Sequence, residues 1–174
     1  VYKTVLGNLY FPSFSVVNWY DIFIRREYQE IFVDSIQFCQ KKKGLLLYCY
    51  CIMPSHLHWI ASTQEGISLG NILRSYKSFT AIEIMNAIEL NPRESRKEWL
   101  RKEFAYFGRT SSQKQDRQFW QHDNHPFELY SNAMIDQKVE YIHNNPIEAG
   151  FTDSQEAWRL SSANPESPIK VLDL

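Results

Sequence analysis

The chain has 174 residues, of which 44% are hydrophobic and 22% are charged, and its formal net charge is −1. This length and composition are typical of one globular domain with a sizeable core. No apolar run is long enough to cross a membrane, which excludes a transmembrane helix. The near-zero net charge excludes a strong overall attraction to nucleic acid, so DNA binding would have to depend on local patches.

The N-terminal third predicts a strand followed by a helix. Segment 9–20 is aromatic and β-branched, which favours a strand, with Pro12 tolerated near a sheet edge. Residues 25–43 predict a helix that ends at Gly44. Its apolar residues share one face: Tyr28, Phe32, Ile36 and Cys39.

A hairpin and a second helix are expected next. Residues 45–52 and 56–62 predict two strands joined around Pro54. Ser68 is a suitable N-cap for the helix that follows. Its apolar stripe consists of Leu69, Ile72, Leu73, Tyr76 and Phe79.

The second half of the chain predicts two more helices. A basic helix is expected over 93–106, and 108–118 lacks periodicity and predicts a mobile loop. Residues 119–124 favour a short strand, and about 132–144 favours a final helix that Pro146 would end.

This order of elements predicts an α+β fold with a central antiparallel sheet and helices packed mainly on its faces. We expect one domain over 1–174, with a core at about 9–163 and a weakly patterned tail at 164–174. The three cysteines are odd in number and show no CxxC spacing, and no secretory signal opens the chain shown. Reduced, buried thiols in a cytoplasmic protein are therefore expected.

The stretch "MPSHLHWI" places His56 and His58 on the predicted second strand of the hairpin. Residues two apart on a strand point the same way, about 7 Å apart, so two imidazoles can converge on one cation. By itself an HxH pattern is a weak signal, and two histidines on a solvated face are the simpler interpretation.

The final helix adds a second group of polar residues. Its core stripe is formed by Ile135, Val139 and Ile142. Tyr141 and Asn145 share a neighbouring face at i and i+4, together with Lys138. If this face approaches the histidines, it offers a third metal ligand beside a potential nucleophile.

Two motifs carry a resemblance to a known family. "YCYCIMPSHLHWI" and "KVEYIHNNPIEAGF" resemble the single-tyrosine HUH transposases, in particular the REP-associated tyrosine transposases and related small insertion-sequence enzymes. "FWQHDNHP" and "WRLSSA" also resemble segments of this family, and the similarity extends over about 9–163.

The resemblance implies a ferredoxin-like HUH endonuclease fold with the catalytic tyrosine on a C-terminal helix. It also implies that the protein cleaves and rejoins single-stranded DNA at REP-like hairpins through a 5′-phosphotyrosine intermediate. By motif position Tyr141 matches the nucleophile, and His56, His58 and Asn145 match the ligands of a divalent metal, Mg²⁺ or Mn²⁺. No nucleotide cofactor or membrane partner is expected, and the protein is a monomer or a homodimer.

Four residues are candidates for DNA binding: Arg74, Lys77, Trp120 and His125. A solvated helix face explains the two basic residues equally well. His122 and His125 form an HxxH that could hold a second metal, but a loop that contacts DNA or packs on Trp120 is favoured. For His143, inside the tyrosine motif, a structural role is favoured.

Two other functions compete with a transposase. A domesticated relative would hold a DNA hairpin without cutting it, but the complete set of Tyr141, His56, His58 and Asn145 argues against lost catalysis. A replication-initiator or relaxase nickase would share the histidine pair, but the short chain without a helicase segment argues against it.

Overall fold

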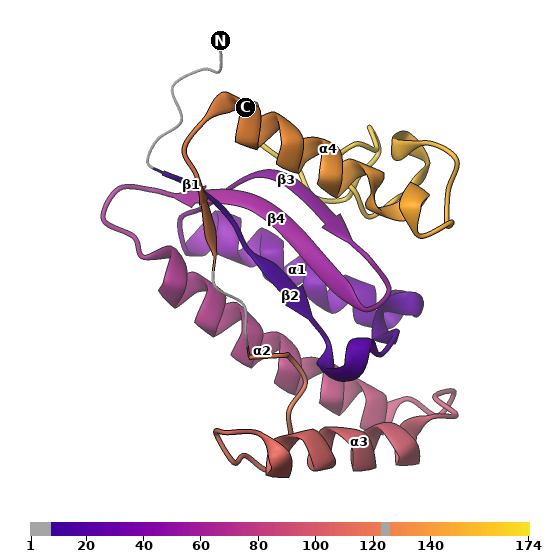
Figure 1. Cartoon of the computed structure of the whole chain (residues 1–174). Helices are drawn as coiled ribbons and strands as arrows, with labels where there is room; N and C mark the ends of the chain where they lie inside the picture. Colours follow the sequence, from indigo (N-terminus) through magenta and orange to yellow (C-terminus); the bar gives the residue numbers. More distant parts are fainter. Residues whose placement is uncertain (1–7, 123–125) are drawn as a thin grey trace.

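The computed structural model describes residues 8–122 and 126–174 (Figure 1). The helices are α1 Arg26–Lys42, α2 Leu69–Leu90, α3 Lys97–Thr110 and α4 Asn132–Glu148. The strands are β1 Leu9–Phe11, β2 Ser13–Ser15, β3 Leu45–Ile52, β4 His56–Thr63 and β5 Phe127–Leu129. An antiparallel sheet lies between α4 on one face and α1 with α2 on the other, while α3 packs against α2 away from the sheet (Figure 1). The predicted α+β class is confirmed.

Strand β4 is the centre of the sheet. It pairs with β3 along one edge and with both β1 and β2 along the other, and β5 pairs with β1. Segment 9–20 is therefore not one strand. Pro12 separates β1 from β2 because proline has no N–H for the ladder, although its carbonyl still accepts from the Trp59 N–H at 3.1 Å. After β2 the chain leaves the sheet through a turn in which Asn18 and Trp19 have positive φ.

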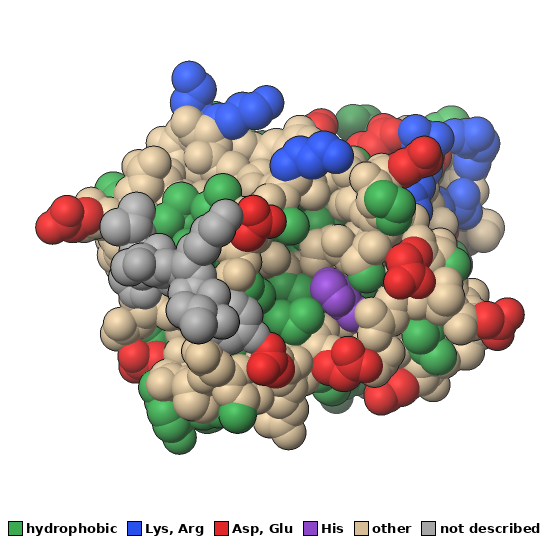
Figure 2. All heavy atoms as spheres, turned by 90° about the horizontal axis from the view of Figure 1, so that it is seen from above, with side chains coloured by type: hydrophobic (Ala, Val, Ile, Leu, Met, Phe, Trp, Pro, Cys, Tyr) green, Lys and Arg blue, Asp and Glu red, His purple; other side chains and the backbone are tan. Residues whose placement is uncertain are grey.

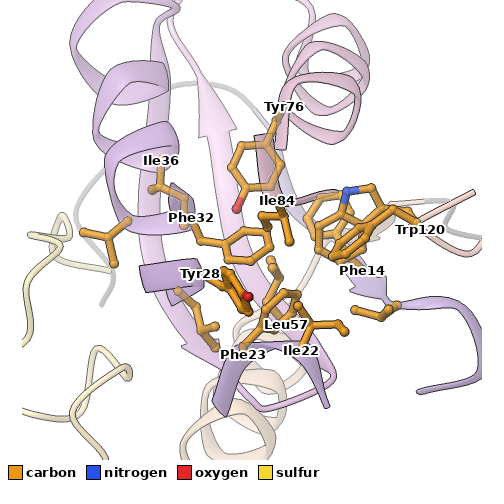
Figure 3. Packing of buried hydrophobic residues seen from close by; sticks show 14 of the residues in the cluster. Phe14, Ile22, Phe23, Tyr28, Phe32, Ile36, Leu57, Tyr76, Ile84 and Trp120 are labelled. Atoms are coloured by element: carbon orange, nitrogen blue, oxygen red, sulfur yellow. The ribbon is translucent and has the colours of Figure 1, made fainter. Parts of the chain in front are cut away.

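The face of the sheet under α1 and α2 holds the larger core. Leu57 and Trp59 of β4 point into it and are fully buried. Figure 3 shows Phe14, Phe32 and other aromatic rings packed together there between the two helices and the sheet. The histidines, which alternate with these residues along β4, consequently lie on the opposite face, toward α4.

Helix α4 continues past the predicted 132–144, and Pro146 lies inside it. Pro146 is buried, and this packing offsets the one backbone hydrogen bond that proline cannot donate in the last turn. The helix is ended instead by Gly150, at φ 77°, after which the Phe151 N–H bonds back to the Pro146 carbonyl at 2.9 Å. Asn145 therefore belongs to the regular helix.

The region around α3 differs from the prediction in two ways. The helix starts at Lys97 rather than near 93, because Glu94 is buried in the preceding turn and binds Arg25 and Arg96. The segment after the helix folds back on it: the Gln118 N–H bonds to the Phe104 carbonyl at 2.8 Å.

The short strand predicted at 119–124 is also misplaced. Of segment 119–124, residues 119–122 are described, and there only Trp120 forms a bridge, with Val16. The strand of this region is β5, a few residues later. Among the residues described, no helix is long and apolar enough to cross a membrane.

Candidate active site

The site lies where α4 crosses the histidine face of β4. His56 is opposite Ser15 of β2, and His58 is opposite Ser13. The two imidazole rings point to the same side of the sheet, and their centroids are 5.0 Å apart. His58 is only 6% exposed. The predicted convergence of the two rings is therefore present, and they do not lie on a freely solvated face.

Serine hydroxyls orient both imidazoles from one side. Nδ1 of His58 bonds with the hydroxyl of Ser13, and Nδ1 of His56 bonds with the hydroxyl of Ser55 at 3.1 Å. A serine oxygen accepts from Nδ1–H as readily as it donates to Nδ1. In the tautomer with Nδ1 protonated, both Nε2 lone pairs are available for a ligand, an arrangement typical of metal-binding histidines.

The two Nε2 atoms have unequal surroundings. Nε2 of His56 lies 3.1 Å from Oδ1 of Asn145, an oxygen that can only accept hydrogen bonds. Nε2 of His58 is buried without a hydrogen-bond partner in the described structure. Burying such an atom unpaired costs about 1–3 kcal/mol, so the fold retains an unfavourable group where a ligand would relieve it.

Burial keeps both imidazoles neutral. Loss of solvent lowers the pKa of His56, an effect that the Asn145 hydrogen bond partly opposes. Burial, followed by repulsion from His56 and Lys138, lowers the pKa of His58 to about 3. Neutral imidazole is the form that binds metals and accepts protons, so both rings are in that form at neutral pH.

Tyr141 of α4 lies directly against the histidine pair. Its ring centroid is 5.3 Å from that of His58, and 40% of the residue remains exposed. Asn145 follows one helical turn later and reaches His56. The shared helix face predicted for Tyr141 and Asn145 thus faces the histidines, and all four residues meet at one place.

Two residues that the sequence did not identify complete the surroundings. Phe11 of β1 stacks on His58 at 5.4 Å and contacts the edge of Tyr141 at 6.0 Å. Trp19 packs against His56 at 5.1 Å and is 57% exposed. The break at Pro12 and the turn after β2 place these rings here, and neither is visible as a sequence motif.

These residues fit a divalent cation. Nε2 of His56 can donate to Oδ1 of Asn145 only while it carries a hydrogen; with both rings protonated at Nδ1 instead, these two atoms and Nε2 of His58 would each offer a lone pair. Mixed nitrogen and oxygen ligands suit Mn²⁺ or Mg²⁺. Within the described ranges no three His, Cys, Asp or Glu side chains form a metal cluster, so an amide or the substrate would supply the remaining ligands.

His143 points to a different neighbour, as expected for a structural role. Its Nε2 lies 2.9 Å from the Ser162 hydroxyl and 3.2 Å from the Cys49 thiol. These contacts attach α4 to β3 and to the C-terminal segment. Cys49, Cys51 and Cys39 are buried and free, as predicted.

The two basic residues predicted to bind DNA lie on the side of the sheet opposite the histidines. Arg74 and Lys77 line a groove of about 490 Å³ between α2 and the 113–122 segment, together with Arg117 and His122. Arg74 is exposed, but Lys77 is half-buried and its ammonium donates to the Gln121 carbonyl at 3.0 Å. Arg74 is therefore the freer of the two predicted phosphate contacts.

The structure contradicts the predicted contact of Trp120 with DNA and does not test the one predicted for His125. Trp120 is 4% exposed, belongs to the large core beside Phe14 (Figure 3), and its indole N–H donates to Thr80. It cannot stack on a DNA base. His125 and Asp123 lie outside the described residues, so a second metal site at the HxxH is not tested, although its other member, His122, is described and lines the α2 groove.

The outer surface of α4 is acidic. Figure 2 views the molecule from the α4 side: one histidine is visible beside hydrophobic side chains, Asp and Glu side chains lie around it, and Lys and Arg gather toward one edge. The exposed acids on α4 itself are Asp136, Glu140 and Glu148. Lys138 is the one basic residue of this helix. DNA would therefore meet repulsion across most of α4.

Comparison with known proteins shows the fold. No protein-family model and no curated protein matches the sequence. Among solved structures, a REP-associated tyrosine transposase bound to a REP hairpin aligns with a TM-score of 0.64, covering 100% of this chain and 94% of the other at 16% identity. A candidate transposase from Deinococcus radiodurans R1 aligns over 82% of this chain and 94% of the other, at 13% identity and a TM-score of 0.49. The resemblance read from the sequence is thus confirmed at the level of the fold.

Proposed function

We propose that this protein is a transposase of the single-tyrosine HUH type, which cleaves and rejoins single-stranded DNA with Tyr141 as the nucleophile. One observation carries the proposal: α4 holds Tyr141 against His58 while Asn145, one turn later, reaches Nε2 of His56. The fold shared with a REP-associated tyrosine transposase supports it.

The chemistry follows from the groups present. The Tyr141 oxygen attacks the phosphorus of a phosphodiester and gives up its proton, and the bond from phosphorus to the 3′ oxygen breaks. The 3′ oxygen leaves and takes up a proton, while the 5′ side stays on Tyr141 as a phosphotyrosine. One phosphate ester replaces another, so a 3′-hydroxyl of a second strand can reverse the step without an external energy source.

A tyrosine needs help for this reaction, because its ordinary pKa is about 10. His56, His58 and Asn145 would hold a Mg²⁺ or Mn²⁺ ion, which supplies Lewis-acid polarisation of the phosphate when bound. The protein's own contribution is orientation. Ser13 and Ser55 fix the imidazoles, and the packing of α4 keeps Tyr141 and Asn145 at a set distance from them.

Recognition of the DNA is assigned to two places. Trp19 offers an exposed ring beside His56 on which an unpaired base could stack. Arg74 and Arg117, in the groove along α2, offer cations for the backbone. By analogy with the hairpin-bound transposase, we propose a single-stranded DNA hairpin as substrate.

The direct test is a search for the covalent intermediate. The protein is incubated with labelled single-stranded hairpins and Mn²⁺, and the products are separated under denaturing conditions. We expect a shifted band with the wild type and none with Tyr141→Phe, which keeps the ring and should bind metal and DNA normally. Tyr130→Phe, at an 80% exposed tyrosine, is the matched control and should retain the band.

The outcomes separate the candidate functions. A band that persists in Tyr141→Phe shows that another residue is the nucleophile. Hairpin binding by the wild type with no covalent band under any metal condition would favour a domesticated binding protein over a transposase.

A further inference from the structure

Lys138 is a cation without an ionic partner at the candidate active site. In the described residues no carboxylate lies within ion-pair distance of it. The helix itself explains this, because the positions one turn away on either side are Met134, Ile135, Tyr141 and Ile142. Most arginines of α3 and the turn before it, by contrast, are paired with glutamates or an aspartate.

The ammonium lies over the two rings that cover His58. Nζ of Lys138 is 4.8 Å from the Phe11 ring centroid and 5.3 Å from that of Tyr141. It is close enough to His58 to oppose a positive charge on that ring. A lysine is thus held half-buried beside His58 and Tyr141, and none of the described carboxylates is close enough to form an ion pair with it.

This position of the Lys138 ammonium is unfavourable unless an anion binds at the site. A cation–π contact contributes roughly 0.5–1 kcal/mol at an exposed position, but Lys138 is also the only basic residue on a helix whose exposed charges are otherwise acidic. A phosphate brought to Tyr141 would be repelled by that surface. Lys138 is the one α4 side chain whose positive charge would attract it.

We propose that Lys138 is a further catalytic residue: its ammonium binds a non-bridging oxygen of the scissile phosphate beside Tyr141. This inference rests on the proposed function. The negative charge on the phosphate oxygens increases as Tyr141 attacks, and a fixed cation in a partly dry site stabilises that charge more than water does. The His56 and His58 rings are themselves neutral, so among these side chains Lys138 is the one that would bring a positive charge to the phosphate.

The first experiment tests the anion site without DNA. Inorganic phosphate is titrated into protein labelled with ¹³C-tyrosine, and the Tyr141 signal, assigned by its loss in Tyr141→Phe, is followed by NMR. We expect a saturable shift in the wild type and in Lys138→Arg, and binding at least ~10-fold weaker in Lys138→Met. Sodium chloride at equal ionic strength should have no such effect. Lys102→Met, at an exposed lysine of α3, is the charge-matched control and should respond like the wild type.

The second experiment measures catalysis. At saturating hairpin DNA we expect Lys138→Met to form the covalent complex roughly 10²-fold more slowly, with hairpin affinity and Mn²⁺ binding nearly unchanged and with Lys138→Arg largely active. If Lys138 only packs on the rings, methionine should serve as well and the rate should not fall.

The results distinguish this inference from the proposed function. Phosphate binding that is the same in Lys138→Met and the wild type, or no different from the effect of chloride, overturns the role of Lys138 even if DNA is cleaved. Phosphate binding that depends on Lys138, with no covalent complex from the wild type, supports the anion site and overturns the transposase.

Discussion

The two faces of the central sheet are built from the same strand but differ in kind. Toward α1 and α2, β4 presents Leu57 and Trp59 to an aromatic core. Toward α4 it presents His56 and His58, and the apolar cluster there is small. The first face holds most of the buried apolar residues, whereas the second brings two imidazoles together with Tyr141. Stability and chemistry are thus separated by the two-residue period of one strand.

The largest effect should come from the core face. Trp59→Ala removes a fully buried ring that packs on Phe14 and Tyr76. We expect a loss of about 3–5 kcal/mol in the free energy of unfolding, measured by urea denaturation. A loss below about 1 kcal/mol would mean that this face does not dominate the stability of the fold.

The histidine face should respond much less. His58→Leu removes the unpaired Nε2 but also the Nδ1 hydrogen bond to Ser13, so the free energy of unfolding at neutral pH should change by no more than about 1 kcal/mol, while cleavage is lost. A loss of several kcal/mol would instead show that the imidazole is a structural part of the core.

The same variant tests the pH dependence. The pKa of His58 is lowered from 6.5 to about 3 in the folded protein, so between these values the unfolded chain binds the extra proton. Stability therefore falls as pH decreases through this window, by a contribution of the order of a few kcal/mol. Measured with a chelator present, the wild type should lose more stability than His58→Leu between pH 7 and pH 4. Parallel curves would contradict the burial of this ring.

A smaller effect is expected where DNA meets the site. Trp19→Ala removes an exposed ring beside His56, and single-stranded DNA should bind more weakly by about 1–3 kcal/mol if a base stacks there. Stability should change little. Trp99→Ala, at a 44% exposed tryptophan on α3, is the comparison and should leave affinity unchanged in a fluorescence-anisotropy titration.

The smallest effect concerns the backbone contacts in the α2 groove. Arg74→Ala should reduce the slope of log affinity against log salt by about one, as for one lost phosphate contact. Arg101→Ala should not change the slope, because Arg101 is already bound to Glu89 and Glu98. Equal slopes for both variants and the wild type would restrict DNA binding to the α4 side.

Much of the site could be predicted because it depends on local periodicity. The alternation of side chains along β4 places His56 and His58 on the same face of the sheet. The helical spacing of four residues places Tyr141 and Asn145 on the same face of α4. The stop of the first long helix at Gly44 and the N-cap of α2 at Ser68 could also be predicted from the sequence. Each depends on one residue, the first on a glycine backbone with positive φ and the second on a serine hydroxyl.

The errors share a different cause. Pro146 was expected to end α4, but its burial and the turn at Gly150 decide where the helix stops. Trp120 was placed on the DNA surface, yet the chain after α3 folds back and buries it. In both cases contacts between distant segments outweighed a local preference.

The sequence by itself determined which residues share a face, because the periods of strand and helix are properties of the local backbone. Only the tertiary structure decided which faces meet. It brings Asn145 of α4 to His56 of β4, places Phe11 and Trp19 at the border of the site, and holds Lys138 there over the Tyr141 ring without an ion pair to any described carboxylate. These contacts depend on the packing of segments that are far apart in the chain. The burial that lowers the pKa of His58 exists only after those segments have packed.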